Sequence, residues 1–302
     1  MKTTAPEGER SGDVETRLTP ALSHSQTVFL KLGGSIITDK MQVEHARVDV
    51  IQRLAREVRA ALDARPDLQL VLGHGSGSFG HVAAKKYGTR DGVQDRAGWI
   101  GLAEVAAAAA RLNQIVTDIF IEERVPVVSL PPSASARCED GLLVYLDTQI
   151  LATHLHNGLA PLVYGDVALD AARGATIVST EDVFAYLVNE IEPAWVLLAG
   201  EVGGVYPNAD MTGEVIPLIT PDTVERHASA LGGSHGVDVT GGMAAKVWQV
   251  SEWVRAHPQL SARIFSAGEA GTLQRALLDP AAPIGTLIRA DASDEVGRRF
   301  PG

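Results

Sequence analysis

Short apolar runs alternate with longer amphipathic segments along most of the chain. The apolar runs are rich in β-branched residues, and most lack polar residues at every second position, which is typical of strands buried on both faces of a sheet. They lie at residues 27–32, 68–73, 125–130, 160–165, 194–200, 262–267 and 284–290. This alternation predicts an α/β fold with a mostly parallel central sheet covered by helices.

The segments between these runs have the period of helices. Between the first two runs, Ile51, Leu54, Val58 and Leu62 recur at three- and four-residue spacing, which predicts an amphipathic helix that stops near Pro66. Further helices are expected from Phe79, over 99–123, over 147–158, over 220–233 with Thr220 or Asp222 as N-cap, and over 241–258. Residues 166–183 break the alternation and predict a β-hairpin, or an extended loop, followed by a helix that starts near Ser179.

The length and composition suit a globular chain with a large core. Of 302 residues, 45% are hydrophobic, which is enough for one large α/β unit or for two lobes that share a sheet. Residues 1–26 are polar and lack the apolar stretch of a signal peptide, so we expect a flexible tail. A boundary near Pro193 would divide the remainder into an N-terminal lobe, 27–192, and a C-terminal lobe, 193–302.

Charge and cysteine content argue against several classes of partner. The net charge of -11 would repel nucleic acid and anionic membranes, so neither is an expected partner. The longest apolar stretch, 101–112, contains Glu104 and Arg111 and is too short to span a bilayer. Cys138 is the only cysteine, which excludes an intrachain disulfide, and its thiol is expected to be inert. These features together predict a soluble, cytoplasmic protein.

A glycine-rich junction, "GHGSGSFGH", follows the second predicted strand. Gly75, Gly77 and Gly80 match the dinucleotide fingerprint G-x-G-x-x-G, but that motif needs an acidic residue at the end of a second strand about 20 residues later. Asp91 and Asp95 follow no apolar run. Backbone N–H groups at a strand-to-helix junction still suit an anion, so the junction predicts a phosphate site; a turn tightly packed for structural reasons is the alternative.

Three lysines lie where a phosphate would explain them. Lys31 ends the first predicted strand, a costly place for a buried cation unless it faces an anion, and Lys40 follows shortly after. Lys246 lies near the start of a predicted helix, where a cation opposes the helix dipole. Lysines that only reach solvent are the alternative. Because phosphoryl transfer requires mainly positioning and positive charge, these lysines and glycines predict a kinase, although the chain lacks the Walker and protein-kinase signatures.

Seven motifs in order resemble the amino acid kinase superfamily, and within it the isopentenyl phosphate kinases. They are "FLKLGGSIITDK", "GHGSGSFGHVAAKKYG", "YGDVALD", "STED", "GGVYP", "DVTGGMAAKV" and "GTLI", and the resemblance spans residues 27 to about 290. It implies a three-layer αβα sandwich, with the acceptor in the N-terminal lobe and ATP in the C-terminal lobe. It also implies a homodimer, and a reaction that converts ATP and isopentenyl phosphate into ADP and isopentenyl diphosphate. Mg²⁺ would arrive on the ATP phosphates, because no cluster in the sequence has metal-ligand spacing.

The resemblance also implies roles for individual residues. Lys31, Lys40 and Lys246 would act on the ATP phosphates and the transferred group, and Asp182 would orient the lysines unless it is only a helix cap. His81 would contact the acceptor phosphate, unless it is a histidine packed on a helix face, whereas His74 is expected to be structural. The acceptor site would include Gly75, Ser76, Gly77 and Gly80. The nucleotide site would include Gly33, Gly34, Ser35, Asp166, Gly204, Tyr206, Thr240, Gly241 and Gly242.

Two motifs depart from the family's usual form. Ser76 replaces a glycine, which adds a side chain near the acceptor, and "AGEVGGVY" (199–206) replaces the usual "TDVDGVY" and loses both aspartates. Alternatives therefore stay open. A fosfomycin kinase shares the lysines and the histidine, a carbamate or acyl-phosphate kinase would leave His81 without a purpose, and a non-catalytic nucleotide-binding sensor or storage protein would not need all three lysines.

Overall fold

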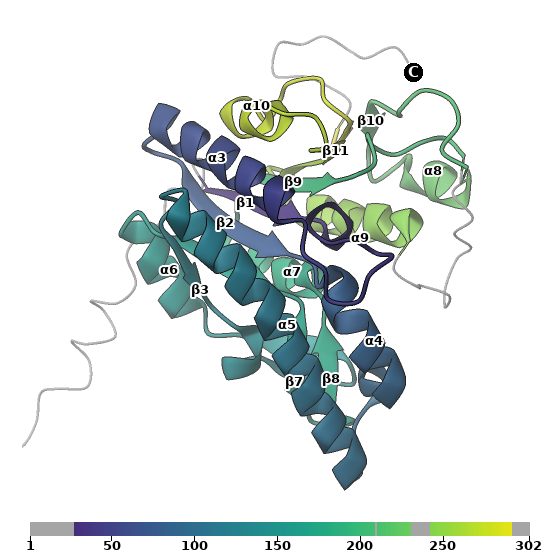
Figure 1. Ribbon diagram of the computed structural model, residues 1–302. Helices are drawn as coiled ribbons and strands as arrows, with labels where there is room; N and C mark the ends of the chain where they lie inside the picture. The colour runs from purple at the N-terminus through teal and green to yellow at the C-terminus, as the bar shows by residue number, and fades with distance from the viewer. Residues whose placement is uncertain (1–26, 209, 231–241, 292–302) are drawn as a thin grey trace, which may run out of the picture.

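The computed structural model describes residues 27–208, 210–230 and 242–291, so the expected tail, 1–26, lies outside the described residues (Figure 1). Its main sheet has eight strands in the order β10-β12-β11-β9-β1-β2-β6-β3. All neighbouring pairs are parallel except β11 and β12. The bounds are β1 Thr27–Leu32, β2 Gln69–His74, β3 Val127–Ser129, β6 Ala160–Tyr164, β9 Trp195–Gly200, β10 Leu218–Ile219, β11 Ser261–Ser266 and β12 Thr286–Ile288.

All seven apolar runs form strands of this sheet, which confirms the prediction of a mostly parallel α/β fold. A second sheet of four strands, in the order β5-β4-β7-β8, was not expected as such. Its strands are β4 Arg137–Glu139, β5 Leu142–Tyr145, β7 Asp166–Asp170 and β8 Gly174–Val178. The predicted hairpin is confirmed, because β7 and β8 pair antiparallel in register from Asp166–Val178 to Asp170–Gly174.

Helices cover both faces of the main sheet, which confirms the three-layer αβα sandwich. On one face, which is in front in Figure 1, lie α3 (Val48–Ala64), α5 (Arg96–Glu122) and α10 (Thr272–Leu278). On the other face lie α6 (Thr148–His156), α7 (Thr180–Ile191) and α9 (Met243–Ala256). Three further helices are α2 (Gly34–Ile37), α4 (Gly77–Tyr87) and α8 (Val224–Ala230), and the short 3₁₀ turns are Thr89–Asp91 and Pro132–Ala134.

Side chains of β1 alternate between the two faces. Val28, Leu30 and Leu32 pack in the cluster under α3, α5 and α10, whereas Phe29 packs in the cluster under α6, α7 and α9. Because side chains of a strand alternate, Lys31 lies on the same face as Phe29, toward α7 and α9. This alternation decides which helices the lysine meets.

Strands from both parts of the chain form one continuous sheet. β1, β2, β3 and β6 come from residues 27–192, and β9 to β12 come from the remainder, with β1 and β9 paired at the junction. The division into an acceptor lobe and a nucleotide lobe stays a prediction. Among the described residues, none of the helices has the length and hydrophobicity that crossing a membrane requires.

Candidate functional site

Lys31 lies at the carboxyl end of β1, and its side chain is buried. The residue is only 6% exposed, and its Nζ lies 2.6 Å from Oε1 of Glu181. A buried ammonium is stable only when paired, and Glu181 supplies the pair. Adjacent to Lys31 on β2 is Gly73, where a Cβ would lie 2.8 Å from the Phe184 ring and from Thr180, so α7 packs directly against this end of the sheet.

The N-terminus of α7 positions Glu181. Ser179 is the N-cap and forms a capping box with Asp182, and the predicted helix start is thereby confirmed. The Thr180 hydroxyl donates to the carbonyl oxygen of His74 at 2.6 Å, which attaches the first turn of α7 to the end of β2. This attachment directs the Glu181 carboxylate to the ends of β1 and β2.

Lys246 approaches the same carboxylate from α9. Its Nζ lies 4.0 Å from Oε1 of Glu181, and its backbone N–H donates to the carbonyl of the N-cap Gly242, as expected for a residue near the start of the helix. Burial lowers the pKa of Lys246, and the charges of Lys31 and Lys40 lower it further, while Glu181 acts in the opposite direction. The positive charges of the other two predicted lysines therefore act on Lys246.

Glu181 stays ionised in this cluster. Burial by itself would raise its pKa, but the charges of Lys31 and Lys246 outweigh burial and hold the pKa of Glu181 below its usual value. One carboxylate thus faces Lys31 and Lys246, with the charge of Lys40 nearby. The excess of positive charge suits a polyanion at the carboxyl edge of the sheet, where ligands of such folds bind.

Two glycine-rich junctions pack backbone against backbone beside the lysines. A Cβ on Gly34 would lie 2.5 Å from the Gly77 nitrogen, and a Cβ on Gly75 would lie 2.9 Å from the Gly34 nitrogen. Gly77 has φ +50°, and a side chain there would overlap Thr38. The glycines are therefore required for the close approach of the segments after β1 and β2. The alternative interpretation, a turn tightly packed for structural reasons, predicts the same.

The rest of the "GHGSGSFGH" junction forms the start of α4. Ser76 is the N-cap without a side-chain capping bond, and its Oγ packs against Gly80. His81 lies in the first half of α4, but its side chain lies outside the described part of the structure. His74 is buried, lies within 3.2 Å of Asn113 Oδ1 and stacks on Tyr164, as expected for a structural histidine.

The two predicted aspartates have partners away from the lysines. Asp182 Oδ2 accepts hydrogen bonds from the Ser179 N–H and hydroxyl at 2.8 and 2.7 Å, which is its capping alternative. Asp166 is buried at the start of β7, where the N–H groups of Ser133 and Val167 donate to it. Burial raises the pKa of Asp166, and these hydrogen bonds only partly offset the effect. A catalytic role for Asp182 and a nucleotide contact for Asp166 stay predictions.

The segment after β9 lies beside the first junction. The Gly33 N–H donates to the Ala199 carbonyl at 2.8 Å, and the Val205 N–H donates to Oγ1 of Thr286 at 2.8 Å. A Cβ on Gly204 would overlap Val215, and Tyr206 is partly buried. Thr286 belongs to "GTLI", so this motif holds in place residues 199–206, which we name the "AGEVGG" segment. Thr240 and Gly241 lie outside the described residues.

Glu181 is the candidate site side chain that the sequence reasoning missed. It stands in the quoted motif "STED" next to Asp182, and both acidic residues lie in the first turn of α7. Which of them faces the lysines depends on the rotation of α7, and docking of Thr180 on β2 sets that rotation. The sequence held one signal for this choice. Asp182 lies three residues after Ser179, where its carboxylate completes a capping box, and this leaves Glu181 to face the lysines.

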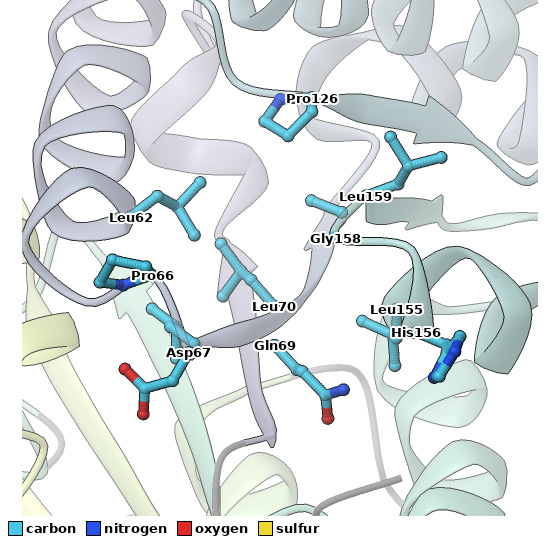
Figure 2. Close-up of a pocket in the computed structure, with 12 residues that line it drawn as sticks. Leu62, Pro66, Asp67, Gln69, Leu70, Pro126, Leu155, His156, Gly158 and Leu159 are labelled. Carbon is cyan, nitrogen blue, oxygen red and sulfur yellow. The ribbon is translucent and has the colours of Figure 1, made fainter. Parts of the chain in front are cut away.

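A small pocket lies far from these residues, at the opposite edge of the sheet. About 170 Å³ in volume, it is lined by residues at the starts of β2 and β6, among them Gln69, Leu70, His156 and Leu159 (Figure 2). Since Lys31 lies at the other end of the parallel strands, this pocket is not the lysine site. Among the described residues, no group of three or more His, Cys, Asp or Glu could hold a metal ion.

Comparison with known proteins agrees with the fold. The family model "Amino acid kinase family" matches residues 26–266. The chain belongs to this family. It is 32% identical over 260 residues to the isopentenyl phosphate kinase of Methanocaldococcus jannaschii, covering 83% of this chain and 94% of that protein. It is 40% identical over 223 residues to the enzyme of the same name from Haloferax volcanii, covering 73% and 85%.

Solved structures give the same result. A structure described as "X-ray structures of isopentenyl phosphate kinase" superposes with a TM-score of 0.70 at 27% identity, covering 87% of this chain and 99% of that one. The product complex of the Thermoplasma acidophilum enzyme has a TM-score of 0.65 at 24% identity, covers 87% of this chain and 100% of that one, and supports the fold. The sequence-based assignment to this family is confirmed.

Proposed function

We propose that this protein transfers the γ-phosphoryl group of ATP to isopentenyl phosphate and forms isopentenyl diphosphate and ADP. In this reaction an oxygen of the acceptor phosphate attacks the γ-phosphorus as the bond to the β–γ bridging oxygen breaks. ADP leaves with the electron pair of the broken bond. The reaction needs two anionic groups brought together in line, and cations that offset their repulsion and the charge on the equatorial oxygens.

The arrangement of Lys31 and Lys246 around Glu181 is the observation that carries the proposal. The two ammoniums come from different elements and share one carboxylate. Oε1 of Glu181 lies 2.6 Å from Nζ of Lys31 and 4.0 Å from Nζ of Lys246. A carboxylate so placed fixes the two ammoniums while leaving donors free to face phosphate oxygens. Lys40 adds a third cation, whose field already acts on Lys246. Members of the same family that match this chain carry the name isopentenyl phosphate kinase.

The proposal assigns the two substrates to the two lobes. Gly33, Gly34 and Ser35 would line the track of the β- and γ-phosphates, together with Gly242. The second segment of the nucleotide site would include Gly204 and Tyr206, and the remaining proposed members are Asp166, Thr240 and Gly241. The acceptor phosphate would bind at the start of α4, where His81, Gly75, Ser76, Gly77 and Gly80 lie. Asp182 is retained as a proposed participant that acts on the lysines.

Cofactor, assembly and location complete the proposal. The lysine cluster fits the phosphates of ATP, and Mg²⁺ would bind as part of MgATP, whose phosphoryl group it makes more electrophilic. A homodimer and a cytoplasmic location, where ATP is supplied, belong to the same proposal. We include no nucleic-acid partner, because the net charge of -11 would repel one.

An assay of ADP release over several acceptors tests the proposal. Isopentenyl phosphate, dimethylallyl phosphate, fosfomycin and carbamate are offered with MgATP, and we expect turnover with isopentenyl phosphate. Turnover with fosfomycin alone would favour the phosphonate kinase, and MgATP binding without turnover of any acceptor would favour the sensor. Replacing His81 by Ala should reduce kcat/KM for the acceptor by a factor that corresponds to roughly 1.5–3 kcal/mol, the contribution of a charge-assisted hydrogen bond.

A further inference from the structure

Residues 38–47, which we name the Lys40 loop, connect α2 to α3 and form a closed hairpin. Thr38 and Ala46 form an antiparallel bridge, and the Asp39 N–H donates to the His45 carbonyl at 2.9 Å. The Asp39 carboxylate accepts the Met41 N–H at 2.8 Å, which closes the turn around Lys40. Lys40 is exposed, and among the described residues no carboxylate pairs with its ammonium. Its position is therefore set by the loop that carries it.

One ion pair attaches the Lys40 loop to α5. Arg111 donates from Nε and Nη2 to the two carboxylate oxygens of Glu44, at 2.9 and 2.5 Å. Glu44 has a positive φ of 51°, and its N–H points to the Ser78 carbonyl at 3.5 Å, at the start of α4. This contact ties the loop to the part of the protein where the acceptor is proposed to bind.

A second ion pair attaches the loop to the other part of the chain. Nη1 of Arg47 lies 2.8 Å from Oε1 of Glu201, which belongs to the "AGEVGG" segment after β9. That segment is held in turn by Thr286 through the Val205 N–H. The Lys40 loop therefore contacts both predicted lobes, and it forms one arginine–glutamate ion pair with each.

These contacts do little for folding. The side chains of Arg47 and Glu201 are 38% and 41% exposed, and exposed ion pairs add little to stability because water and salt screen them. Their geometric effect is larger, since they join a short loop that carries a site lysine to a segment more than 150 residues away. The main effect of the Arg47–Glu201 ion pair is therefore on the position of Lys40.

We propose that Arg47 and Glu201 are positioning residues of the phosphoryl-transfer reaction. Their ion pair, together with the Glu44–Arg111 pair, holds the Lys40 loop between the two lobes and so places the Lys40 ammonium over the transferred group. The inference rests on the proposed function. The "AGEVGG" segment differs from the usual form of its motif in the family. The proposal gives Glu201 of this segment a role in catalysis that requires no direct contact with the nucleotide.

The test uses the full chain and seven variants: R47Q, E201Q, R47Q/E201Q, the charge exchange R47E/E201R, K40M, K40M/E201Q and the control E123Q. The control removes an equally close ion pair of α3, Arg56–Glu123 at 2.9 Å, away from the lysines. Hydrogen–deuterium exchange of peptides covering residues 38–47 is measured in the free protein. Separately, kcat and both KM values are measured with MgATP and isopentenyl phosphate.

We expect R47Q and E201Q to speed exchange in the Lys40 loop and to lower kcat about five-fold, while both KM values change less than about two-fold. The double variant should lose no more than either single variant, and R47E/E201R should recover most of kcat and protection. In a K40M background, E201Q should cause no further loss. E123Q should match the wild type in both measurements.

Three results would overturn the inference: unchanged exchange and kcat in both single variants, no recovery in the charge exchange, or the same loss from E201Q in the K40M background. The last result would mean that the pair acts independently of Lys40. If the wild-type protein does not phosphorylate isopentenyl phosphate, the proposed function fails. Exchange in the free protein still decides whether the ion pair holds the loop.

Discussion

At the scale of single residues, the fold changes the acid–base chemistry of Lys246. Burial lowers its pKa from 10.5, and the charge of Lys31 lowers it further. An ammonium with a lowered pKa loses its proton, and its attraction for phosphate, at a lower pH than an ordinary lysine. We expect kcat/KM for ATP to fall along an alkaline limb below pH 10.5, and K246R to move this limb to higher pH because arginine stays charged.

The matched control for that profile is K85R, which changes an exposed lysine of α4 and should leave the limb in place. The measurement is the pH dependence of kcat/KM in the free enzyme, since that ratio reports on groups before ATP binds. An identical limb in wild type and K246R would assign the titration to another group.

A second prediction at this scale separates the two acidic residues of α7. E181Q leaves the buried Lys31 ammonium without its 2.6 Å partner, so we expect kcat to fall at least about ten-fold. D182N removes the capping box that Asp182 forms with Ser179, so we expect a loss of about 1 kcal/mol in the free energy of unfolding and a smaller kinetic effect.

Steady-state kinetics and urea unfolding of both variants check this. A larger loss of kcat in D182N than in E181Q would return the orienting role to Asp182.

The contribution of Glu181 to the stability of the protein also has a predictable pH dependence. Because the folded-state pKa of Glu181 is lowered, its contribution is present above the unfolded-state pKa and is lost as pH falls through the lowered value.

At the scale of elements, the buried parallel strands were predictable and the second sheet was not. Strands such as β1 and β9 can be predicted from the sequence because both of their faces are apolar. In contrast, β4 has three residues and a register shift between Arg137 and Cys138, and β5 exposes Leu142 and Val144. Such short strands form through tertiary pairing, which local sequence does not encode.

The "GTLI" motif provides the element-scale prediction. Gly285 has φ +61°, and a Cβ there would overlap the Ile264 carbonyl and lie 2.8 Å from that of Gly203. Gly88 has the same φ and open space around it. We expect G88A to cost about 1–2 kcal/mol for its left-handed backbone. G285A should add about 1–3 kcal/mol of overpacking and raise KM for ATP by displacing the "AGEVGG" segment.

Thermal or urea unfolding of both glycine variants, with KM for ATP measured alongside, decides this. The difference between the two variants isolates crowding from backbone strain because the dihedral penalty is common to both. Equal losses of stability, with KM for ATP unchanged in G285A, would show that the motif does not support the segment after β9.

At the scale of the whole molecule, the sequence predicted where the site lies better than how it is assembled. Lys31 and Lys246 could be singled out because strand ends and helix starts are poor places for cations without an anion. Their meeting at Glu181 depends on three separate facts: the alternation of β1, the docking of α7 on β2 and the approach of α9. None of these is local in sequence, so the carboxylate between the lysines could not be chosen beforehand.

Because the lysines come from β1, the Lys40 loop and α9, a ligand that contacts all three must bind the folded chain alone. MgATP at 100 times its dissociation constant should therefore stabilise the protein by about 2.7 kcal/mol and raise the melting temperature by several degrees. The double variant K31M/K246M should lose this shift, whereas K85R should keep it. Scanning calorimetry with and without MgATP measures the shift independently of turnover. An equal shift in K31M/K246M would mean that the nucleotide binds away from the lysines, and the proposed site would have to be abandoned even if the enzyme were active.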